Sequence, residues 1–472
     1  MATRSCVIVG GGISGLASAY RLSRMASSQA LGLAITVLES GVRAGGVIQS
    51  RSEEGFLLES GPDAFLSDKP WAVDLCRELG LEKEMVGTQP DFRRSFIVRQ
   101  GKLVPVPEGW YLVAPGSLRT LLRSPLLTLG GKLRMACEPF IPPRLGEEDE
   151  SVAAFVRRRF GQQALERIAQ PMIGGITTAP TEQLSLLAAV PQLREMEKSH
   201  GSVTRALRGR GAATAKASGP RYSLFVTLRA GMQQLVDALI AAMPGVTLRT
   251  QAAVIRIERG AQGEPWKIHL TGGEAIAADA LCLALPAPAA APIVASVSQP
   301  LATALSAISY ASVATVNLAF AQADVPHPLN GFGIVIPAQE QRQAVGITFA
   351  SVKFAGRAPQ GSVLVRIFIA GAAFPQGILP SSEELIRIAR EEIRGLLGID
   401  AEPKLASAAR YPASMPQYAV GHFEQVAAIE RFIAGEPGLF LSGNGLRGLG
   451  IPDCVRQATE SAGRIMTYLK ST

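Results

Sequence analysis

Cysteine and histidine are scarce in this 472-residue sequence, which contains five cysteines and four histidines. The cysteines stand singly, without a Cys-x-x-Cys pair and without the Cys/His spacing of a zinc site. We therefore expect no metal site and no disulfide framework, and we interpret the cysteines as reduced thiols, most of them in the core, of a protein in a cytosol-like compartment. No histidine lies in a pattern typical of a general base, and we interpret His422 as a structural residue.

A clear membrane-spanning run is also missing. The segment between Asp279 and Asp324 carries no formal charge and is long enough to cross a bilayer, but it is interrupted by Pro286, Pro288, Pro292 and Pro300. We expect a buried strand over residues 280–285, a turn, a helix and a second strand over 313–320. The apolar stretch after Met1 is too short for a secretory signal.

The sequence has no acidic excess, since its formal net charge is +8. Residues 90–222 hold 20 Lys and Arg against 11 Asp and Glu, so this segment carries the whole excess. Such asymmetry suggests an acidic partner, namely nucleic acid, anionic lipid or an acidic substrate, and the alternative is a solvated basic face. The basic residues are not interleaved with a stacking motif, so we expect no nucleic-acid partner.

A dinucleotide-binding pattern opens the chain. Gly10, Gly12 and Gly15 form a Gly-x-Gly-x-x-Gly motif between an expected strand at 7–9 and an expected helix over 14–25. The first glycine permits the tight turn, the second lets the backbone approach a pyrophosphate, and the third lets the helix pack on the strand. Glu39 ends the next expected strand, where a carboxylate can bind ribose hydroxyls. The pattern predicts bound NAD or FAD.

The residues after Glu39 favour FAD. Arg43 can pair with a phosphate, and Gly45-Gly46 lets the backbone pass close to a flat ring. Near the other end, a strand runs into Gly443-Asn444 and then a helix entry at Gly450-Ile451-Pro452, whose N-terminus can stabilise negative charge on a reduced flavin. Together these segments resemble the FAD-containing amine oxidase, carotenoid desaturase and porphyrinogen oxidase superfamily.

Three further motifs are more specific, and they resemble the oxygen-dependent protoporphyrinogen oxidase family. They are the Gly-Pro-Asp turn at Gly61-Pro62-Asp63, the segment 175–185, and the Pro-Gln-Tyr…Gly-His segment at 416–422. With the C-terminal motif, the resemblance covers nearly the whole chain in the right order. It implies FAD contacts from Gly10, Gly12, Ile13, Ser14, Gly15, Glu39, Ser40, Arg43, Gly45, Gly46, Gly61, Pro62, Asp63, Val254, Gly443, Asn444, Gly450, Ile451 and Pro452.

The resemblance also implies a reaction. Members of the family oxidise protoporphyrinogen IX to protoporphyrin IX in haem biosynthesis, with hydride transfer to the flavin and reoxidation by molecular oxygen, which gives hydrogen peroxide. The chemistry belongs to the cofactor, so no side chain is expected to act as a catalytic acid or base. A branch of the family oxidises coproporphyrinogen III, and this stays open as the alternative. An amine oxidase would share the flavin frame but not the motifs at 175–185 and 416–422, and a carotenoid desaturase would need no basic helical insert of this kind. A non-catalytic membrane flavoprotein is a further alternative.

The tetrapyrrole site follows from the same resemblance. Gly175 is the expected close-approach residue, and Val335, Thr348 and Phe368 align with apolar residues that sandwich the macrocycle, although an aliphatic residue is usual at Thr348. Many members carry an arginine for the substrate propionates where this chain has Ser95, with Arg94 one residue earlier. Ser95 and the following segment 106–109 resemble the coproporphyrinogen branch.

The implied fold class is α/β with α+β insertions. A Rossmann-like FAD-binding domain takes residues 1–88, 227–285 and 412–472; a helical membrane-docking domain takes 89–226, with a mobile loop near 201–221; and a mixed-sheet substrate-binding domain takes 286–411. The basic charge and the Trp110-Tyr111 pair match peripheral docking on the inner face of the cell membrane of a cytoplasmic enzyme, and a homodimer stays open.

Overall fold

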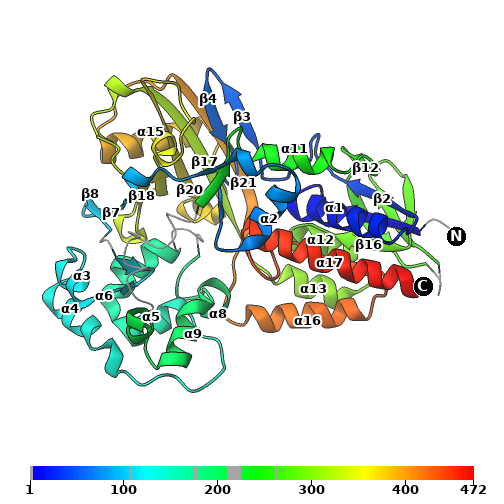
Figure 1. Cartoon of the computed structure of the whole chain (residues 1–472), viewed down its shortest axis with the longest axis horizontal. Helices are drawn as coiled ribbons and strands as arrows, with labels where there is room; N and C mark the ends of the chain where they lie inside the picture. Colours follow the sequence, from blue (N-terminus) through cyan, green and yellow to red (C-terminus); the bar gives the residue numbers. More distant parts are fainter. Residues whose placement is uncertain (1–3, 107–108, 175–178, 210–224, 261–263) are drawn as a thin grey trace.

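The computed structural model describes residues 4–106, 109–174, 179–209, 225–260 and 264–472, so Gly175 lies outside the described residues. The chain forms a mixed α/β structure in which both termini lie at the same end (Figure 1). A parallel sheet with its helices occupies that end, and a seven-stranded sheet and a helical part occupy the other. This arrangement places residues far apart in the sequence around shared cavities.

A five-stranded parallel sheet with the order β12-β2-β1-β16-β22 forms the centre of the first part. Its strands are β1 (Arg4–Val9), β2 (Leu33–Leu38), β12 (Val246–Arg249), β16 (Ala280–Leu283) and β22 (Leu439–Leu441). Their short apolar runs suit strands that are covered on both faces. Helices α1 (Ile13–Ser28), α11 (Gln233–Ala241) and α17 (Ile451–Ser471) share one hydrophobic core with this sheet. Strands and helices from both ends of the chain thus lie in one parallel α/β unit, in keeping with the predicted α/β fold class.

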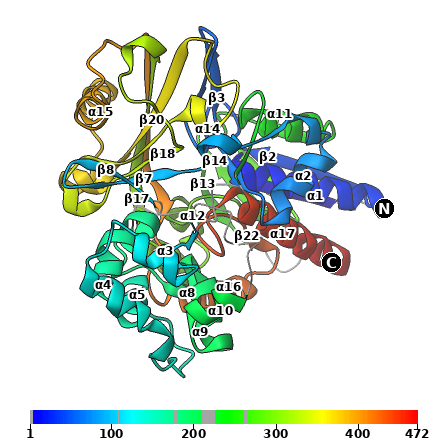
Figure 2. The same ribbon diagram turned by 60° about the vertical axis from the view of Figure 1, so that its left-hand side comes forward.

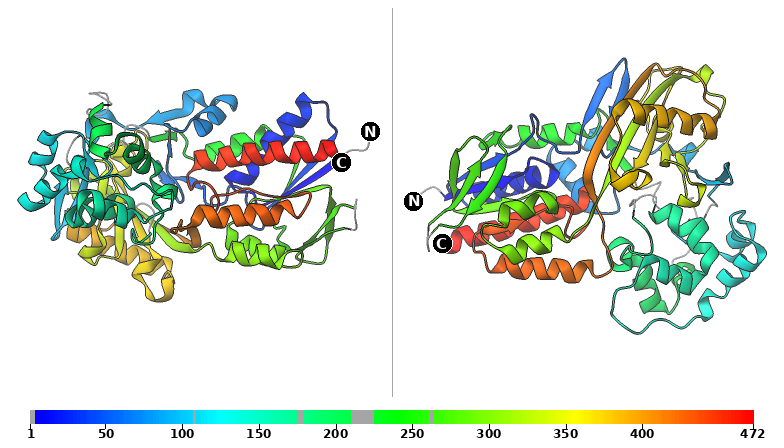
Figure 3. Two further views of the ribbon diagram at one scale, coloured as in Figure 1. Left: turned by 90° about the horizontal axis from the view of Figure 1, so that it is seen from below. Right: turned by 180° about the vertical axis from the view of Figure 1, so that it is seen from behind.

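The opposite face of the parallel sheet is covered by a small antiparallel sheet and three helices. The sheet consists of β13 (Val254–Glu258), β14 (Trp266–Leu270) and β15 (Ala275–Ala278), and the helices are α12 (Ala287–Val294), α13 (Gln299–Ser306) and α16 (His422–Ala434) (Figure 3). The uncharged run thus forms β16, α12, α13 and the next strand, and no helix in the described ranges is long and apolar enough to span a membrane. Residues 286–306, expected in the substrate-binding domain, instead pack here because their apolar sides share this core.

The seven-stranded sheet has the order β21-β17-β20-β19-β18-β7-β8. Its strands are β7 (Ser95–Arg99), β8 (Lys102–Pro105), β17 (Tyr310–Ala321), β18 (Gly333–Val335), β19 (Ala344–Thr348), β20 (Ser362–Ala370) and β21 (Leu405–Pro416). Neighbours are antiparallel except β18 and β7, which are parallel. Helix α15 (Ser382–Leu397) covers one face, and Ser381 caps it as its sequence predicts, by accepting a hydrogen bond from the Glu384 N–H.

Strands β7 and β8 belong to the seven-stranded sheet and not to the helical domain, in which the boundary expected at residue 88 would place them. Strand β7 pairs with β18, and β8 pairs with β7 at the edge of the sheet. The helical part therefore begins after Pro105. Likewise, β21 crosses the expected boundary at residue 411.

The helical part lies below the seven-stranded sheet in the views of Figures 1 and 2. Its main helices are α3 (Leu118–Arg123), α4 (Leu129–Ala136), α5 (Val152–Phe160), the π-helix η4 (Leu165–Gly174), α9 (Pro191–His200) and α10 (Val203–Gly209). Part of the basic excess is used internally, since Arg159 is fully buried against Glu138 and also pairs with Glu197. The loop expected near 201–221 is helical in its first part, and residues 210–224 lie outside the described residues.

Candidate functional site

The first glycine turn has the geometry that the motif requires. Gly10 has φ +107°, and a Cβ on Gly15 would lie 1.9 Å from the Gly10 carbonyl oxygen, so neither position accepts a side chain. A Cβ on Gly12 would have only Gly46 Cα within 4 Å, at 4.0 Å. The backbone at Gly12, directly before α1, is therefore open to a ligand at the helix N-terminus.

Glu39 lies at the end of β2, next to this turn. Its carboxylate accepts hydrogen bonds from the Gly11 N–H at 2.9 Å and the Gly41 N–H at 2.7 Å, and a longer one from the Ser40 hydroxyl. A carboxylate has about four acceptor positions, so acceptor capacity remains for hydroxyl groups of a ligand. The side chain is held in place before any ligand arrives.

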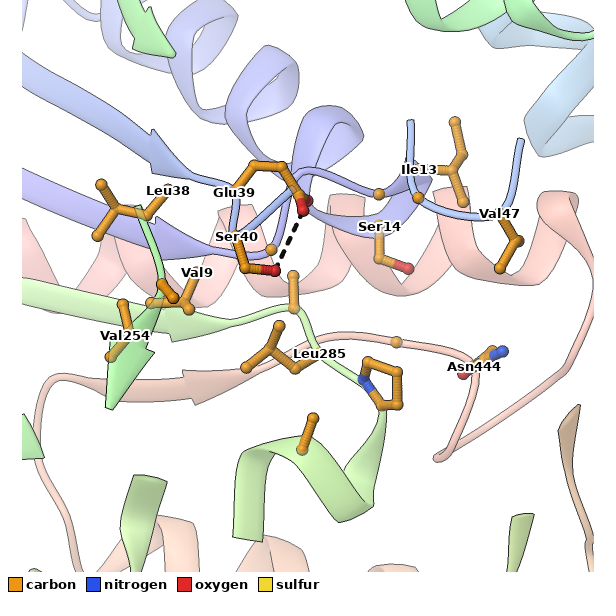
Figure 4. A pocket seen from close by; sticks show the side chains of 18 of the residues that line it. Val9, Ile13, Ser14, Leu38, Glu39, Ser40, Val47, Val254, Leu285 and Asn444 are labelled. Carbon is orange, nitrogen blue, oxygen red and sulfur yellow. Dashed lines mark hydrogen bonds between the residues drawn. The ribbon is translucent and has the colours of Figure 1, made fainter. Parts of the chain in front are cut away.

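A cavity of about 610 Å³ joins these segments (Figure 4). Eleven of the predicted FAD residues line it: Gly10, Gly12, Ile13, Ser14, Glu39, Ser40, Gly45, Gly46, Val254, Gly443 and Asn444. The sequence did not single out the residues after β16, Ala284, Leu285 and Pro286, which form another part of the wall. The signal for them was present, because ligands in parallel α/β sheets bind beyond the carboxyl ends of the strands.

Arg43 has a different role from the expected phosphate contact. It is absent from the cavity wall, and its guanidinium donates to the carbonyl oxygens of Ala44, Gly46 and Ile48 and to Gln49 Oε1. These acceptors belong to the loop that contains Gly45-Gly46. Arg43 therefore shapes the glycine turn from within.

The Gly61-Pro62-Asp63 turn lies between the parallel sheet part and the seven-stranded sheet. A Cβ on Gly61 would lie 1.7 Å from the Val47 carbonyl oxygen, so the turn packs directly on the loop after Gly46. Burial opposes ionisation of Asp63, but Lys353 at 3.2 Å and Arg366 at 3.8 Å outweigh it and hold the pKa of this carboxyl below its usual range. The turn thus carries a fixed negative charge bound by two cations.

The C-terminal segment is held by Tyr418 and His422. The Tyr418 hydroxyl donates to the Asn444 carbonyl at 2.6 Å and accepts from the Gly448 N–H at 2.8 Å. His422 stacks on the Tyr418 ring, with centroids 3.9 Å apart, and its Nε2 lies 2.7 Å from the Leu446 carbonyl. Burial lowers the pKa of His422, so its neutral form donates to that carbonyl. The histidine is structural, as the sequence predicts, whereas the bridging role of the Tyr418 hydroxyl was missed.

Gly450, Ile451 and Pro452 form the N-cap and first turn of α17 rather than the cavity wall. Asp453, in the same turn, pairs with Lys69 at 2.6 Å. The next residue, Cys454, does line the cavity, and burial raises the pKa of its thiol to about 11. The thiol therefore stays protonated near neutral pH and contributes an uncharged surface.

Four predicted substrate residues share one face of the seven-stranded sheet. One row across the strands contains Ser95, Gly333, Thr348, Arg366 and Asn317, and the next contains Ile97, Val335, Gly346, Phe368 and Thr315. Residues paired across strands lie on the same face, so Ser95, Val335, Thr348 and Phe368 do so too. Val335, Thr348 and Phe368 are half-buried in strands that are otherwise mostly buried.

This face looks toward the Gly61 turn. Thr315 Oγ1 donates to the Ser60 carbonyl at 2.6 Å, and Arg366 Nη2 donates to the carbonyls of Ser60 and Gly61. Arg94 departs from the expected arrangement: a Cβ on Gly331 would meet both Arg94 Cγ and the Phe96 ring, so Arg94 lies on the Phe96 side. Of the two candidate positions, Ser95 and not Arg94 faces the same side as Val335.

The family assignment follows from comparison with known proteins. A model of the family described as "Flavin containing amine oxidoreductase" matches residues 13–466. The chain belongs to this family. It is therefore an FAD-dependent oxidoreductase. The cavity that Gly12, Glu39 and Asn444 line is the candidate site for its flavin.

Relatives of this flavin oxidoreductase cover nearly its whole length. It is 33% identical to a coproporphyrinogen III oxidase of Propionibacterium freudenreichii subsp. freudenreichii, over 98% of this chain and 90% of that protein. It is 30% identical to a coproporphyrinogen III oxidase of Bacillus subtilis (strain 168), over 98% of both chains. It is 29% identical to the chloroplastic protoporphyrinogen oxidase 1 of Arabidopsis thaliana, over 99% of this chain and 89% of that protein.

Solved structures agree on the fold. A crystal structure from Exiguobacterium sp. 255-15 superposes with a TM-score of 0.87 at 27% identity and covers 100% of both chains. A reduced UDP-galactopyranose mutase gives a TM-score of 0.74 at 15% identity, over 99% of this chain and 94% of that chain, which shows a shared fold alone. The flavin oxidoreductase fold is thus common to enzymes of different chemistry, and the substrate must be argued from the site.

Proposed function

We propose that this flavoenzyme oxidises coproporphyrinogen III to coproporphyrin III with molecular oxygen as the electron acceptor. The observation that carries the proposal is the set of half-buried side chains Val335, Thr348 and Phe368, which share the sheet face that contacts the Gly61 turn. Two relatives, at 33% and 30% identity, carry the name coproporphyrinogen III oxidase, and this supports coproporphyrinogen III over the protoporphyrinogen IX expected first from the sequence. Ser95, in place of a propionate-binding arginine, supports the same order.

The cofactor contacts follow from the cavity. In this proposal the N–H groups at the start of α1 and the open backbone at Gly12 hold the pyrophosphate, and Glu39 holds the ribose. Gly443 and Asn444 approach the opposite wall. Bound FAD supplies the hydride acceptor, and the side chains around it exclude water and orient the substrate.

The sheet face leaves little room for acid–base chemistry by the protein. Val335 and Phe368 are apolar, and Thr348 offers one neutral hydroxyl. Phe368 lies beneath the Arg366 guanidinium, at 4.8 Å from ring centroid to Cζ, so its ring is held in position. A face of this kind suits a flat, largely apolar macrocycle whose oxidation is carried out by the cofactor.

The direct test compares two porphyrinogens. The purified protein is expected to show a flavin absorption spectrum and, in air, to convert freshly reduced coproporphyrinogen III to fluorescent coproporphyrin with release of hydrogen peroxide. Reactions without enzyme correct for spontaneous oxidation. Faster turnover of protoporphyrinogen IX would favour the second candidate, which the Arabidopsis relative's name supports. Oxidation of neither porphyrinogen would refute the proposal.

We propose further that the helical part docks on an anionic membrane surface through an apolar face on α3, α4 and the following turn. This apolar face consists of Leu118, Leu122, Leu129, Leu133 and Phe140, which are 51–84% exposed. The leucines recur at four-residue spacing, so they line one side of each helix. Arg119 and Arg123 are exposed beside them, and Lys132 Nζ reaches the Leu122 carbonyl at 2.7 Å. Apolar side chains with flanking cations are typical of interfacial binding.

Trp110, which the sequence suggested for docking, and Arg134, a second basic residue of α4, have other positions. Trp110 is only 3% exposed, because it packs inside the helical core. Arg134 donates to the carbonyls of Arg158 and Arg159, so it connects α4 to α5. Docking is therefore proposed without either residue.

Cosedimentation with vesicles tests the apolar face. We expect binding to phosphatidylglycerol vesicles that falls with rising salt and is lost in a Leu122→Ser/Leu129→Ser variant. Ile378→Ser, which removes an exposed apolar side chain on the seven-stranded sheet part, is the matched control and should bind normally. Unchanged binding of the double variant would refute docking through this face. A homodimer stays a prediction.

A further inference from the structure

Arg99 and Arg167 bring two positive charges together where the seven-stranded sheet meets the helical part. Arg99 ends β7, and its Nη1 donates to the Pro125 carbonyl at 2.8 Å. Arg167 lies in η4, and its Nη1 donates to the next carbonyl, Leu126, at 3.1 Å. Two guanidinium groups therefore converge on consecutive carbonyl groups of one loop.

The described part of the chain supplies no carboxylate partner to either arginine. The nearby acids are already engaged: Glu340 accepts the N–H groups of Gln100 and Gly101 at 2.7 and 3.0 Å, and Glu166 accepts from Gln162. Burial, followed by the charge of Arg99, lowers the pKa of Arg167, and the charge of the neighbouring Glu166 offsets only part of this. An arginine has five N–H donors, so each of the two keeps donors for an anion. Two like charges held together in this way are stabilised when an anion binds between them.

The position of the pair relates it to the proposed substrate face. Ser95, Ile97 and Arg99 alternate onto one side of β7, and Ile97 pairs with Val335. Ile97 belongs to the hydrophobic core of the helical part, so this side of β7 faces η4. Strand spacing and rise put the Arg99 backbone about 8 Å from that of Val335.

The opposite side of the same junction is fixed. Three residues after Arg167, Gln170 Oε1 accepts a hydrogen bond of 2.6 Å from Gln339 Nε2, which joins η4 to the segment after β18. A second side-chain contact therefore joins η4 to the sheet part near Arg167. An anion at Arg99 and Arg167 would meet a preformed pair rather than two independent surface chains.

We propose that Arg99 and Arg167 bind a propionate carboxylate of the porphyrinogen while its ring lies against Val335, Thr348 and Phe368. This inference rests on the proposed function. The two arginines would supply the positive charge for the propionate that a serine at position 95 does not. Guanidinium groups form bidentate hydrogen bonds with carboxylates, which fixes the orientation of the ligand as well as its affinity. The pair would therefore act on substrate binding and orientation, not on the oxidation itself.

Arg99→Gln and Arg167→Gln in the FAD-loaded enzyme test the proposal. Each should raise KM for coproporphyrinogen III about tenfold and change kcat by less than about twofold, because one charge-assisted hydrogen-bonded contact is lost. Each lysine variant should fall between wild type and glutamine, since it keeps the charge but loses the fork. Arg157→Gln removes the same charge from an exposed position on α5 and should leave KM unchanged.

A second measurement separates carboxylate binding from a structural role. Fluorescence titration with the product coproporphyrin III should show about tenfold weaker binding to either glutamine variant, whereas its tetramethyl ester should bind wild type and variants alike. Equal losses for acid and ester, or KM within twofold of wild type, would overturn the inference. If wild type oxidises neither porphyrinogen, the proposed function fails, and the titration still decides the carboxylate site by itself.

Discussion

The hydroxyl group of Tyr418 offers a sharp test of how the flavin site is held together. Tyr418 is 2% exposed, and its hydroxyl donates to the Asn444 carbonyl at 2.6 Å and accepts from the Gly448 N–H at 2.8 Å. Gly443 and Asn444 line the flavin cavity. One hydroxyl therefore closes residues 444–448 into a fixed loop, and Tyr418→Phe removes it while the ring stays stacked on His422.

The expected cost follows from the two groups left without partners. An unsatisfied buried donor or acceptor costs about 1–3 kcal/mol, and partial relaxation of the loop recovers some of this. We expect the free energy of unfolding of the FAD-free protein to fall by about 2 kcal/mol, and FAD affinity to fall about tenfold because the Asn444 wall is no longer positioned. Burial raises the pKa of Tyr418 well above its usual value, so the hydroxyl remains a donor across the accessible pH range.

Two measurements check this prediction: urea denaturation of the FAD-free protein, and fluorescence titration with FAD. Tyr20→Phe is the control, since Tyr20 is also buried, at 5% exposure on α1, and its hydroxyl makes no hydrogen bond within the described ranges. It should change neither quantity appreciably. If Tyr418→Phe bound FAD as tightly as wild type, the loop would not depend on the hydroxyl and the reasoning would be wrong.

Three further perturbations probe other parts of the molecule. Burial raises the pKa of Glu59 to about 7 from an ordinary 4.5, so between these two pH values the folded protein keeps a proton on Glu59 that the unfolded chain has lost. The free energy of unfolding should therefore fall by up to about 3 kcal/mol as pH rises from about 4.5 to 7. Urea denaturation at a series of pH values should show that Glu59→Gln removes this fall. Gly15→Ala would force a Cβ to within 1.9 Å of the Gly10 carbonyl oxygen, so the purified variant should lack the flavin absorption band. Glu138→Gln breaks a fully buried pair with Arg159 and should lower the free energy of unfolding by about 3–5 kcal/mol in urea.

Specific results would contradict these predictions. A pH profile of Glu59→Gln that matches wild type would show that this carboxyl titrates normally. A flavin band in Gly15→Ala would mean that the turn can open. For the buried pair, Glu147→Gln is the control, because Glu147 pairs with Lys198 at the surface and its removal should cost little.

Local sequence determined the cofactor site to a large extent. The strand, glycine turn and helix around Gly10, Gly12 and Gly15 depend on backbone conformations and close approaches within a few residues, so the motif carries most of the information. The same holds for the Ser381 cap of α15 and for the helix entry at Gly450. Such features follow from the residues themselves, whatever surrounds them.

Tertiary structure decided which segments these elements meet. Strand β7 was expected within the helical part, but its partner β18 comes from more than two hundred residues later, and hydrogen bonds between strands do not depend on nearness in sequence. Arg43 could bind a phosphate or its own loop, and only the folded loop shows that its two terminal nitrogens donate to oxygens of residues 44–49. Arg99 and Arg167 carry no motif, and their pairing exists because β7 and η4 converge on one loop. The sequence by itself determined the flavin cofactor and the glycine turn of the candidate site, whereas the folded chain decided which side chains share the face of the seven-stranded sheet, because that depends on contacts between distant segments.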